Sequence, residues 1–137
     1  MIERLVIVIA LFAAGYAFYT FWTRQQVRRL ATMPTDPVLQ RLKPGIPAVV
    51  YFTTPGCIPC RTQQQPALAT LAQILGENNV QIIKIDATED PDAADRWGVL
   101  SAPTTFIVDA QGKTTAVNHG VADVDKLKRQ ISIHPAA

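Results

Sequence analysis

AVVYFTTPGCIPC, residues 48–60, sets the architecture of this chain, because an apolar run leads directly into two cysteines. The run at 48–53 has the length and the β-rich composition of a buried central strand. The segment after the cysteines predicts a helix that continues to Gly76, since glycine is a common C-terminal stop. The apolar side chains of that segment are expected on one helical face: Leu68, Leu71, Ile74 and Leu75.

The pair Cys57 and Cys60 has the position and spacing of a redox-active dithiol. Unpaired N–H groups and the dipole at the start of a helix favour an anion, which lowers the pKa of a thiol placed there. Cys57 is therefore the predicted nucleophile, and Cys60, one turn later, is the thiol that resolves the mixed disulfide. Pro59 has a fixed φ and no N–H, and both properties suit the first turn of a helix.

Three other interpretations of the cysteine pair are open. A zinc site would need His119 and His134, or carboxylates, as further ligands, and histidines 15 residues apart lack the spacing of a zinc finger. An inert structural disulfide would close so short a loop that it removes little chain entropy. The cysteines could also be two unrelated core residues. The strand before the pair and the helix after it favour redox chemistry, with no metal.

The remaining sequence predicts strands and helices in alternation, which is typical of an α/β fold with a mixed central sheet flanked by helices. Asp36–Pro37 and Asp90–Pro91 each combine a helix N-cap with a proline at the first helical position. We expect helices over 36–43, over 90–98 and from 123 onward, and strands over 80–86, 104–109 and 113–118.

The first thirty residues are suited to a membrane rather than to water. Leu5 to Trp22 is a run of 18 residues without a charge. As a helix this run would be about 27 Å long, close to the roughly 30 Å hydrocarbon core of a bilayer. A cleaved signal peptide has a shorter apolar region and small residues at the cleavage site, so we favour an uncleaved transmembrane anchor in contact with lipid. The expected organisation is an anchor with a helical extension at 1–30, a linker at 31–35 and a main domain at 36–134.

Charge indicates the side of the membrane and excludes some functions. More positive charge follows the apolar segment than precedes it: Arg24, Arg28, Arg29 and Arg41 against Arg4 beside Glu3. The positive-inside rule therefore predicts a cytoplasm-facing domain, with an extracytoplasmic domain as the alternative. The net charge is only +2, without a basic block that contains interleaved aromatics, so nucleic acid is not an expected partner. Two cysteines are too few for a disulfide-stapled scaffold.

AVVYFTTPGCIPCRTQQQPAL resembles the active-site strand and helix of thioredoxins. KID at 84–86, Asp90–Pro91 and WGVLSAPTTFIVDAQG at 97–112 are similar to the next segments of that family, in the same order and at nearly the same spacing. The resemblance covers about residues 36–133, without the usual first strand. It implies a thioredoxin fold and a thiol–disulfide oxidoreductase in which the cysteine pair itself carries the electrons, without an organic cofactor.

The resemblance also implies roles for residues outside the pair. Pro103 corresponds to the family's cis-proline, so that Ala102–Pro103 would expose backbone to an extended substrate, and Gly120 corresponds to a glycine of the substrate groove. The predicted substrate-binding set is Ile58, Pro59, Ala102, Pro103 and Gly120. Lys84 matches a lysine beneath the active site, although a solvated lysine at a strand end is the alternative. His119 would add positive potential near Cys57, unless it is an exposed histidine without a role.

Three residues depart from the thioredoxin pattern. Tyr51 stands where the family has a buried carboxylate that helps to move the proton of the second cysteine, and a phenol is a poor general base at neutral pH. We still count Tyr51, with Lys84 and His119, among the residues that could tune the thiol pKa values. Gly56 replaces a tryptophan before the first cysteine, and Pro66, the helix-kinking proline, comes one residue later than in most thioredoxins.

The sequence as a whole predicts a membrane-tethered thiol–disulfide oxidoreductase. Its expected partners are protein disulfides or dithiols, an upstream electron donor, and the lipid around Leu5 to Trp22. A redox-responsive binding module with little turnover is the alternative, because Tyr51 is a poor proton acceptor. A zinc-held interaction domain is the third class.

Overall fold

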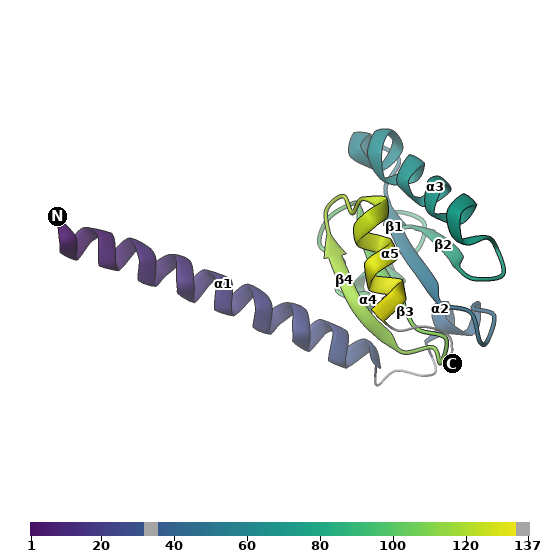
Figure 1. Cartoon of the computed structure of the whole chain (residues 1–137), viewed down its shortest axis with the longest axis horizontal. Helices are drawn as coiled ribbons and strands as arrows, with labels where there is room; N and C mark the ends of the chain where they lie inside the picture. Colours follow the sequence, from purple (N-terminus) through teal and green to yellow (C-terminus); the bar gives the residue numbers. More distant parts are fainter. Residues whose placement is uncertain (32–35, 134–137) are drawn as a thin grey trace.

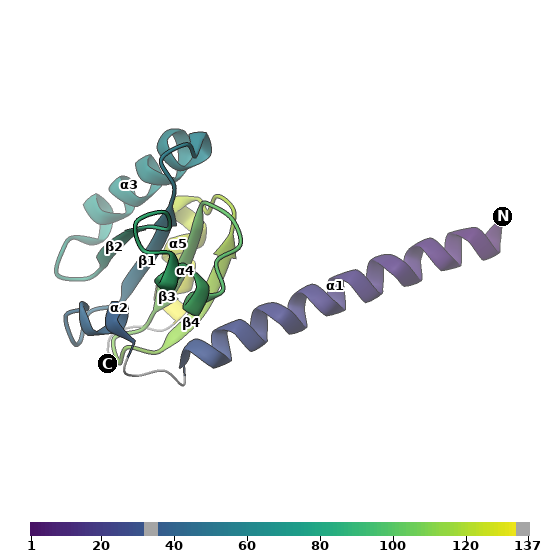
Figure 2. The same ribbon diagram turned by 180° about the vertical axis from the view of Figure 1, so that it is seen from behind.

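The computed structural model describes residues 1–31 and 36–133. A long N-terminal helix projects from a domain in which helices cover both faces of one sheet (Figure 1 and Figure 2). The order of strands and helices after the first helix confirms the predicted order. The elements are α1 (Ile2–Ala31), α2 (Pro37–Gln40), β1 (Ala48–Thr53), a π-helical turn (Cys60–Gln64), α3 (Gln65–Leu75), β2 (Gln81–Asp86), α4 (Pro91–Trp97), β3 (Thr104–Val108), β4 (Thr114–His119) and α5 (Val124–Ile133).

The sheet is mixed, with strand order β2-β1-β3-β4. β1 runs parallel to β2 and antiparallel to β3, so Val50 lies between Ile83 on one side and Phe106 on the other. All six residues of β1 are buried, because the strand has neighbours along both edges and helices over both faces. The segment that follows β1 therefore starts from a strongly constrained position.

Successive side chains of β1 point into two different cores. Val49 and Tyr51 share one core with Leu71 of α3 and Leu127 of α5. Phe52 belongs to the other core, on the face covered by α2 and α4. The two faces of the sheet are thus each closed by a pair of helices.

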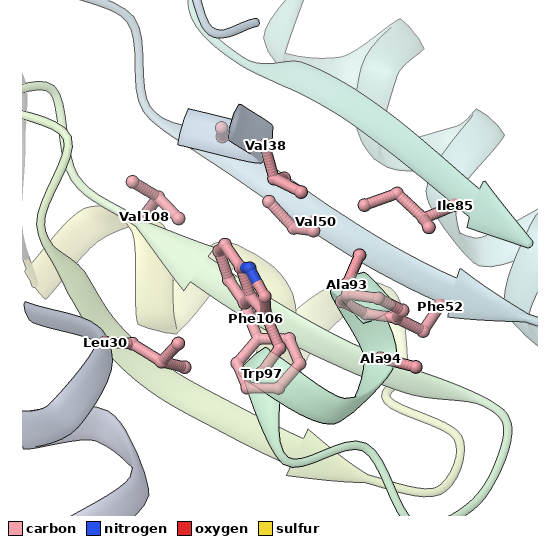
Figure 3. Packing of buried hydrophobic residues seen from close by; sticks show 11 residues of the cluster. Leu30, Val38, Val50, Phe52, Ile85, Ala93, Ala94, Trp97, Phe106 and Val108 are labelled. Carbon is pink, nitrogen blue, oxygen red and sulfur yellow. The ribbon is translucent and has the colours of Figure 1, made fainter. Parts of the chain in front are cut away.

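Trp97, at the end of α4, is the centre of the second core. It is fully buried, and its ring centroid lies 5.9 Å from that of Phe52 and 4.9 Å from that of Phe106. Figure 3 shows these rings together, with Leu30 of α1 beside them. Contacts between tilted or edge-on rings add to the stability gained by burying their surface.

The ends of α4 follow from its sequence. The Asp90 side chain accepts a hydrogen bond from the Ala93 N–H at 3.0 Å, which caps the first turn. Gly98 ends the helix in the left-handed conformation, with φ of 69°. This helix confirms the prediction made from Asp90–Pro91.

Two details of the predicted helices are wrong. Ile74, expected on the buried face of α3, is 53% exposed, because it lies about a quarter turn around the helix from the line through Leu68 and Leu71 that meets the sheet. α2 ends at Gln40 instead of extending to residue 43, because Pro44 disfavours helical dihedrals at the residue before it.

α1 is one continuous helix whose last turns pack on the domain. The Gln26 side chain is buried, and its Nε2 donates to the carbonyl oxygens of Trp97 at 2.6 Å and Gly98 at 2.9 Å. Leu30 is buried in the core that contains Trp97. By contrast, within the described part of the chain, no residue of the most apolar 18-residue window of α1 is buried. Ala31 still belongs to α1, and the rest of the predicted linker, 32–35, lies outside the described residues.

Replacing Trp97 by alanine should lower the free energy of unfolding by about 3–5 kcal/mol, because the change removes a buried ring and leaves a cavity. Urea unfolding of the full-length protein in detergent, followed by circular dichroism, measures this loss. Leu100→Ala is the control, since Leu100 is 81% exposed, and it should change stability by less than about 0.5 kcal/mol. Equal losses in the two variants would contradict the central position of Trp97.

Candidate active site

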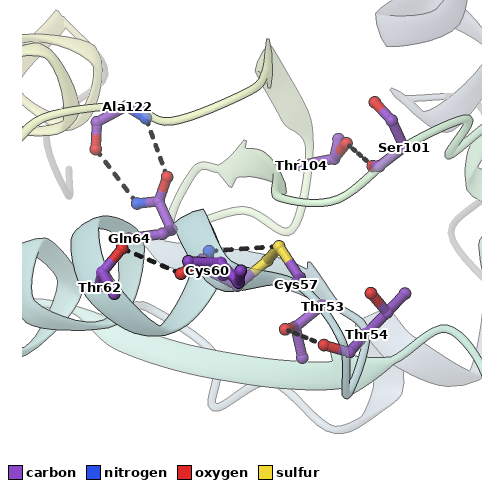
Figure 4. Close-up of a disulfide and its surroundings, with 10 residues drawn as sticks. Thr53, Thr54, Cys57, Cys60, Thr62, Gln64, Ser101, Thr104 and Ala122 are labelled. Atoms are coloured by element: carbon purple, nitrogen blue, oxygen red, sulfur yellow. Dashed lines mark hydrogen bonds between the residues drawn. A yellow bond between two sulfur atoms is a disulfide. The ribbon is translucent and has the colours of Figure 1, made fainter.

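The cysteine pair lies where the C-terminal end of β1 meets the following helix. The strand ends at Thr53, and the Cys57 N–H donates to the Thr54 carbonyl oxygen at 3.2 Å, which closes the turn between strand and helix. Cys57 and Cys60 form a disulfide with Cα atoms 5.3 Å apart (Figure 4). The redox pair thus stands at the end of the fully buried central strand.

The two cysteines differ in access. Cys57 retains 8% exposure, whereas Cys60 is completely buried. The backbone N–H of Cys60 donates to the Cys57 sulfur at 3.2 Å. In the reduced protein, an N–H group and helix dipole in this position favour a thiolate at Cys57. A disulfide that approaches from outside therefore meets the Cys57 sulfur first.

The peptide bond between Ala102 and Pro103 is cis, as the resemblance implied. Ala102 packs against the core that contains Cys57 and Cys60. The Pro103 carbonyl oxygen accepts a hydrogen bond from the Gly120 N–H at 2.9 Å, and Gly120 has φ of 91°, a left-handed conformation that favours glycine. Two predicted groove residues that are distant in sequence are thus held together.

The helix after Cys57 contains a π-helical turn, Cys60–Gln64, which was not predicted from the sequence. The Gln65 N–H bonds back to the Cys60 carbonyl oxygen, five residues earlier, so the turn accommodates one extra residue. The late position of Pro66 relative to thioredoxins was the available signal of this insertion. An extra residue between the second cysteine and the proline moves the proline one place along the chain.

The role of Gln64, at the end of the π-helical turn, was also not predicted, and here the sequence offers no signal. Its side chain is fully buried. Its Nε2 donates to the Ala122 carbonyl oxygen at 3.1 Å, and its Oε1 accepts from the Ala122 N–H at 2.8 Å (Figure 4). The active-site helix is therefore bonded to the segment that follows Gly120.

The three residues predicted to tune the thiols have different surroundings. Tyr51 is buried in the same core as both cysteines, and its hydroxyl has no hydrogen-bond partner among the described residues. Lys84 is exposed on β2, with its Cα opposite that of Tyr51. Burial lowers the pKa of His119 below its usual value of 6.5, and the ring of His119 meets that of Tyr19 of α1 edge-on at 6.3 Å. An effect of these residues on the thiols stays a prediction.

The described part of the chain contains no cluster of side chains that could bind a metal ion. Within residues 1–31 and 36–133, no three or more His, Cys, Asp or Glu side chains gather closely enough to hold a metal ion. His134, the second histidine that a zinc site could use, lies outside the described residues.

Known proteins are similar to this domain in both sequence and fold. The thioredoxin family model matches residues 37–133. Thioredoxin 1 of Synechococcus elongatus is 33% identical over 91 residues, which cover 64% of this chain and 83% of the relative. The thioredoxin of Rhodospirillum rubrum is 37% identical over 86 residues, which cover 63% of this chain and 80% of the relative. The solved structure of Fasciola hepatica thioredoxin superposes with a TM-score of 0.55 at 30% identity, over 66% of this chain and 83% of its own.

The family match begins after α1 and spans the buried strand, the cysteine pair and the cis-proline. Cys57 and Cys60 of this chain form a disulfide, as the cysteine pair of an oxidised thioredoxin does. The chain therefore belongs to the thioredoxin family, and its CxxC pair is that of a thiol–disulfide oxidoreductase.

Proposed function

We propose that this protein is tethered to a membrane and exchanges disulfides with protein partners through Cys57 and Cys60. One observation carries the proposal, namely the asymmetry of the pair. Cys57 reaches the surface and receives the Cys60 N–H on its sulfur, whereas Cys60 is buried. A nucleophile needs access and a stabilised anion, and a resolving thiol needs protection from outside disulfides.

The exchange takes place in two steps in the reduced protein. The Cys57 thiolate attacks one sulfur of a substrate disulfide, which forms a mixed disulfide and releases the other substrate sulfur as a thiolate. Cys60 then loses its proton and attacks the Cys57 sulfur, which breaks the mixed disulfide and releases the second substrate thiolate. Two electrons pass from the cysteine pair to the substrate, and an upstream dithiol donor restores the reduced pair by the reverse sequence.

The substrate segment lies in an extended conformation beside the cis-proline. Ile58 is 64% exposed next to Cys57 and offers an apolar contact. Pro59, Ala102, Pro103 and Gly120 complete the groove that we propose. The hydrogen bond between Gly120 and Pro103 supports this assignment, because it holds two sides of the groove together.

The membrane tether is the apolar part of α1. A helix of this length and composition can cross a bilayer, and its apolar window is not needed to cover the domain. Gln26 and Leu30 attach the other end of α1 to the domain, and Tyr19 contacts His119, the residue before Gly120. The groove would then lie close to the lipid head groups, so we propose membrane proteins, or substrates delivered to the membrane, as partners. By the arginine count around α1, the domain faces the cytoplasm.

A redox-responsive binding module is the second candidate function. The Tyr51 hydroxyl favours it, because this buried group has no bonding partner in the described chain and stands where thioredoxins use a carboxylate. Slow deprotonation of Cys60 would prolong the mixed disulfide and leave the protein bound to its partner. The two candidates differ in turnover.

Replacing Cys57 by serine should abolish reduction of insulin disulfides by the full-length protein, because the attacking sulfur is removed. Cys60→Ser should instead accumulate a mixed disulfide, which nonreducing electrophoresis detects. Brisk turnover of the unaltered protein supports the enzyme, and a stable mixed disulfide without turnover supports the binding module. Turnover that persists in Cys57→Ser would refute both.

Replacing Gln26 by alanine should weaken the fixed attachment of α1, because two hydrogen bonds worth about 1 kcal/mol each are lost. In vesicles that hold both proteins, we expect a loss of roughly ten- to thirtyfold in reduction of a disulfide next to a transmembrane helix. Reduction of soluble insulin should not change. Gln25→Ala, at an exposed neighbouring position, is the matched control. Equal rates for both variants on the membrane substrate would contradict a role for the docked anchor.

His119→Gln should affect Cys57 only in acidic solution. A charged imidazolium would favour a nearby thiolate, but burial lowers the pKa of His119 below its usual value of 6.5, so most of the imidazolium has already lost its charge at pH 6.5. Rates of iodoacetamide alkylation of reduced Cys57 should therefore agree between the variant and the unaltered protein at pH 8. They should diverge only in acidic solution, where His119 is charged, with slower alkylation in the variant. Divergence confined to alkaline solution would contradict this assignment.

A further inference from the structure

The Gln64 side chain forms a closed pair of hydrogen bonds with one backbone unit, that of Ala122. We propose that Gln64 is a positioning residue for protein substrates, which holds the groove wall at the correct distance from Cys57. The inference rests on thiol–disulfide exchange through Cys57 and deepens it, since it assigns substrate alignment to a side chain outside the cysteine pair and the cis-proline.

The position of Gln64 within the helix is the first observation. The π-helical turn begins at Cys60 and ends at Gln64, so the buried cysteine and the amide are parts of one local unit. The π-helical turn absorbs the extra residue locally, and α3 beyond it still buries Leu68 and Leu71. The inserted residue thus changes the neighbourhood of the active site while the rest of the helix keeps its packing.

The position of Ala122 is the second observation. Ala122 is fully buried and comes two residues after Gly120. The Gly120 N–H is bonded to the Pro103 carbonyl oxygen. The cis-proline is therefore linked to the active-site helix in three stages. Pro103 is hydrogen-bonded to Gly120, the backbone leads from Gly120 to Ala122, and Ala122 is hydrogen-bonded to Gln64. If the bonds to Ala122 are removed, the groove wall loses its attachment on the side of the cysteine pair.

The chemistry of the amide is the third observation. Gln64 donates and accepts at once, as a peptide group does, and both bonds are buried. A methionine of similar shape cannot donate and accepts only weakly, and a carboxylate can only accept. Without the amide, the buried N–H and C=O groups of Ala122 would lose these partners, which is unfavourable inside a protein. The segment 120–122 would then move to find others.

The consequence depends on the size of the substrate. A protein disulfide has to align its backbone with Pro103 while its sulfur meets Cys57, so it needs both sides of the groove in place. A small aromatic disulfide needs only access to the Cys57 sulfur. Loss of the Gln64 bonds should therefore impair reaction with proteins and leave reaction with small disulfides intact.

The test compares Gln64→Met with Gln63→Met in the full-length protein. Gln63 is the exposed neighbour in the same π-helical turn. For Gln64→Met we expect kcat/KM with insulin to fall about tenfold or more, mainly through KM, because two buried hydrogen bonds are lost. The second-order rate of the reduced protein with 5,5′-dithiobis(2-nitrobenzoate) should change less than twofold. Gln63→Met should match the unaltered protein in both assays.

Gln64→Glu provides a second test that a general loss of stability cannot imitate. A neutral carboxyl group can donate to the Ala122 carbonyl oxygen and accept from the Ala122 N–H, whereas a carboxylate cannot donate. The ratio of the variant's KM for insulin to that of the unaltered protein should therefore approach one as the pH is lowered. Gln64→Met should show no such recovery.

Several results would overturn the proposal. Equal losses with insulin and with the small disulfide would make Gln64 a merely structural residue, as would a constant KM ratio for Gln64→Glu across the pH range. Unchanged kinetics of Gln64→Met with insulin would deny it any role. If the unaltered protein itself reacts with neither substrate through Cys57, then the proposed function fails, and this outcome is distinct from a failure confined to the Gln64 variants.

Discussion

The hydrogen bond from the Cys60 N–H to the Cys57 sulfur depends on the junction between a buried strand and the first turn of a helix. β1 is buried along its whole length and is bonded to β2 and β3 along its edges. Its C-terminal end therefore holds Cys57 where a helix offers unpaired N–H groups. The buried central strand thus holds Cys57 at a position where it retains some exposure.

The groove that we propose beside this junction would be formed by segments that are distant in sequence. The cis bond before Pro103 starts β3, and Gly120 follows β4, so the β3–β4 hairpin brings the two together. Asn118 bonds to Thr105 across the hairpin and exchanges two hydrogen bonds with Gln130 of α5. The end of the hairpin that precedes Gly120 is therefore attached to α5.

The N-terminal helix is part of the domain as well as a candidate span. Gly98 shows how closely α1 packs on the domain, because a Cβ at this position would lie 2.8 Å from Nε2 of Gln26. The same glycine ends α4 with a positive φ, so both the turn and the approach of α1 require the absence of a side chain. The resemblance to thioredoxins does not include the usual first strand of that family, and α1 supplies Leu30 to the core around Trp97.

The sequence by itself determined the order of strands and helices, the cysteines at a strand–helix junction and the proline that proves to be cis. These features depend on local periodicity, on caps such as Asp90 and on short motifs. Tertiary structure alone decided which groups the buried amides meet. Gln64 finds Ala122 58 residues away, and Gln26 finds Trp97 71 residues away. Such partners are set by how whole elements pack, because a glutamine has the same local pattern whether it faces water, as Gln63 does, or a buried carbonyl.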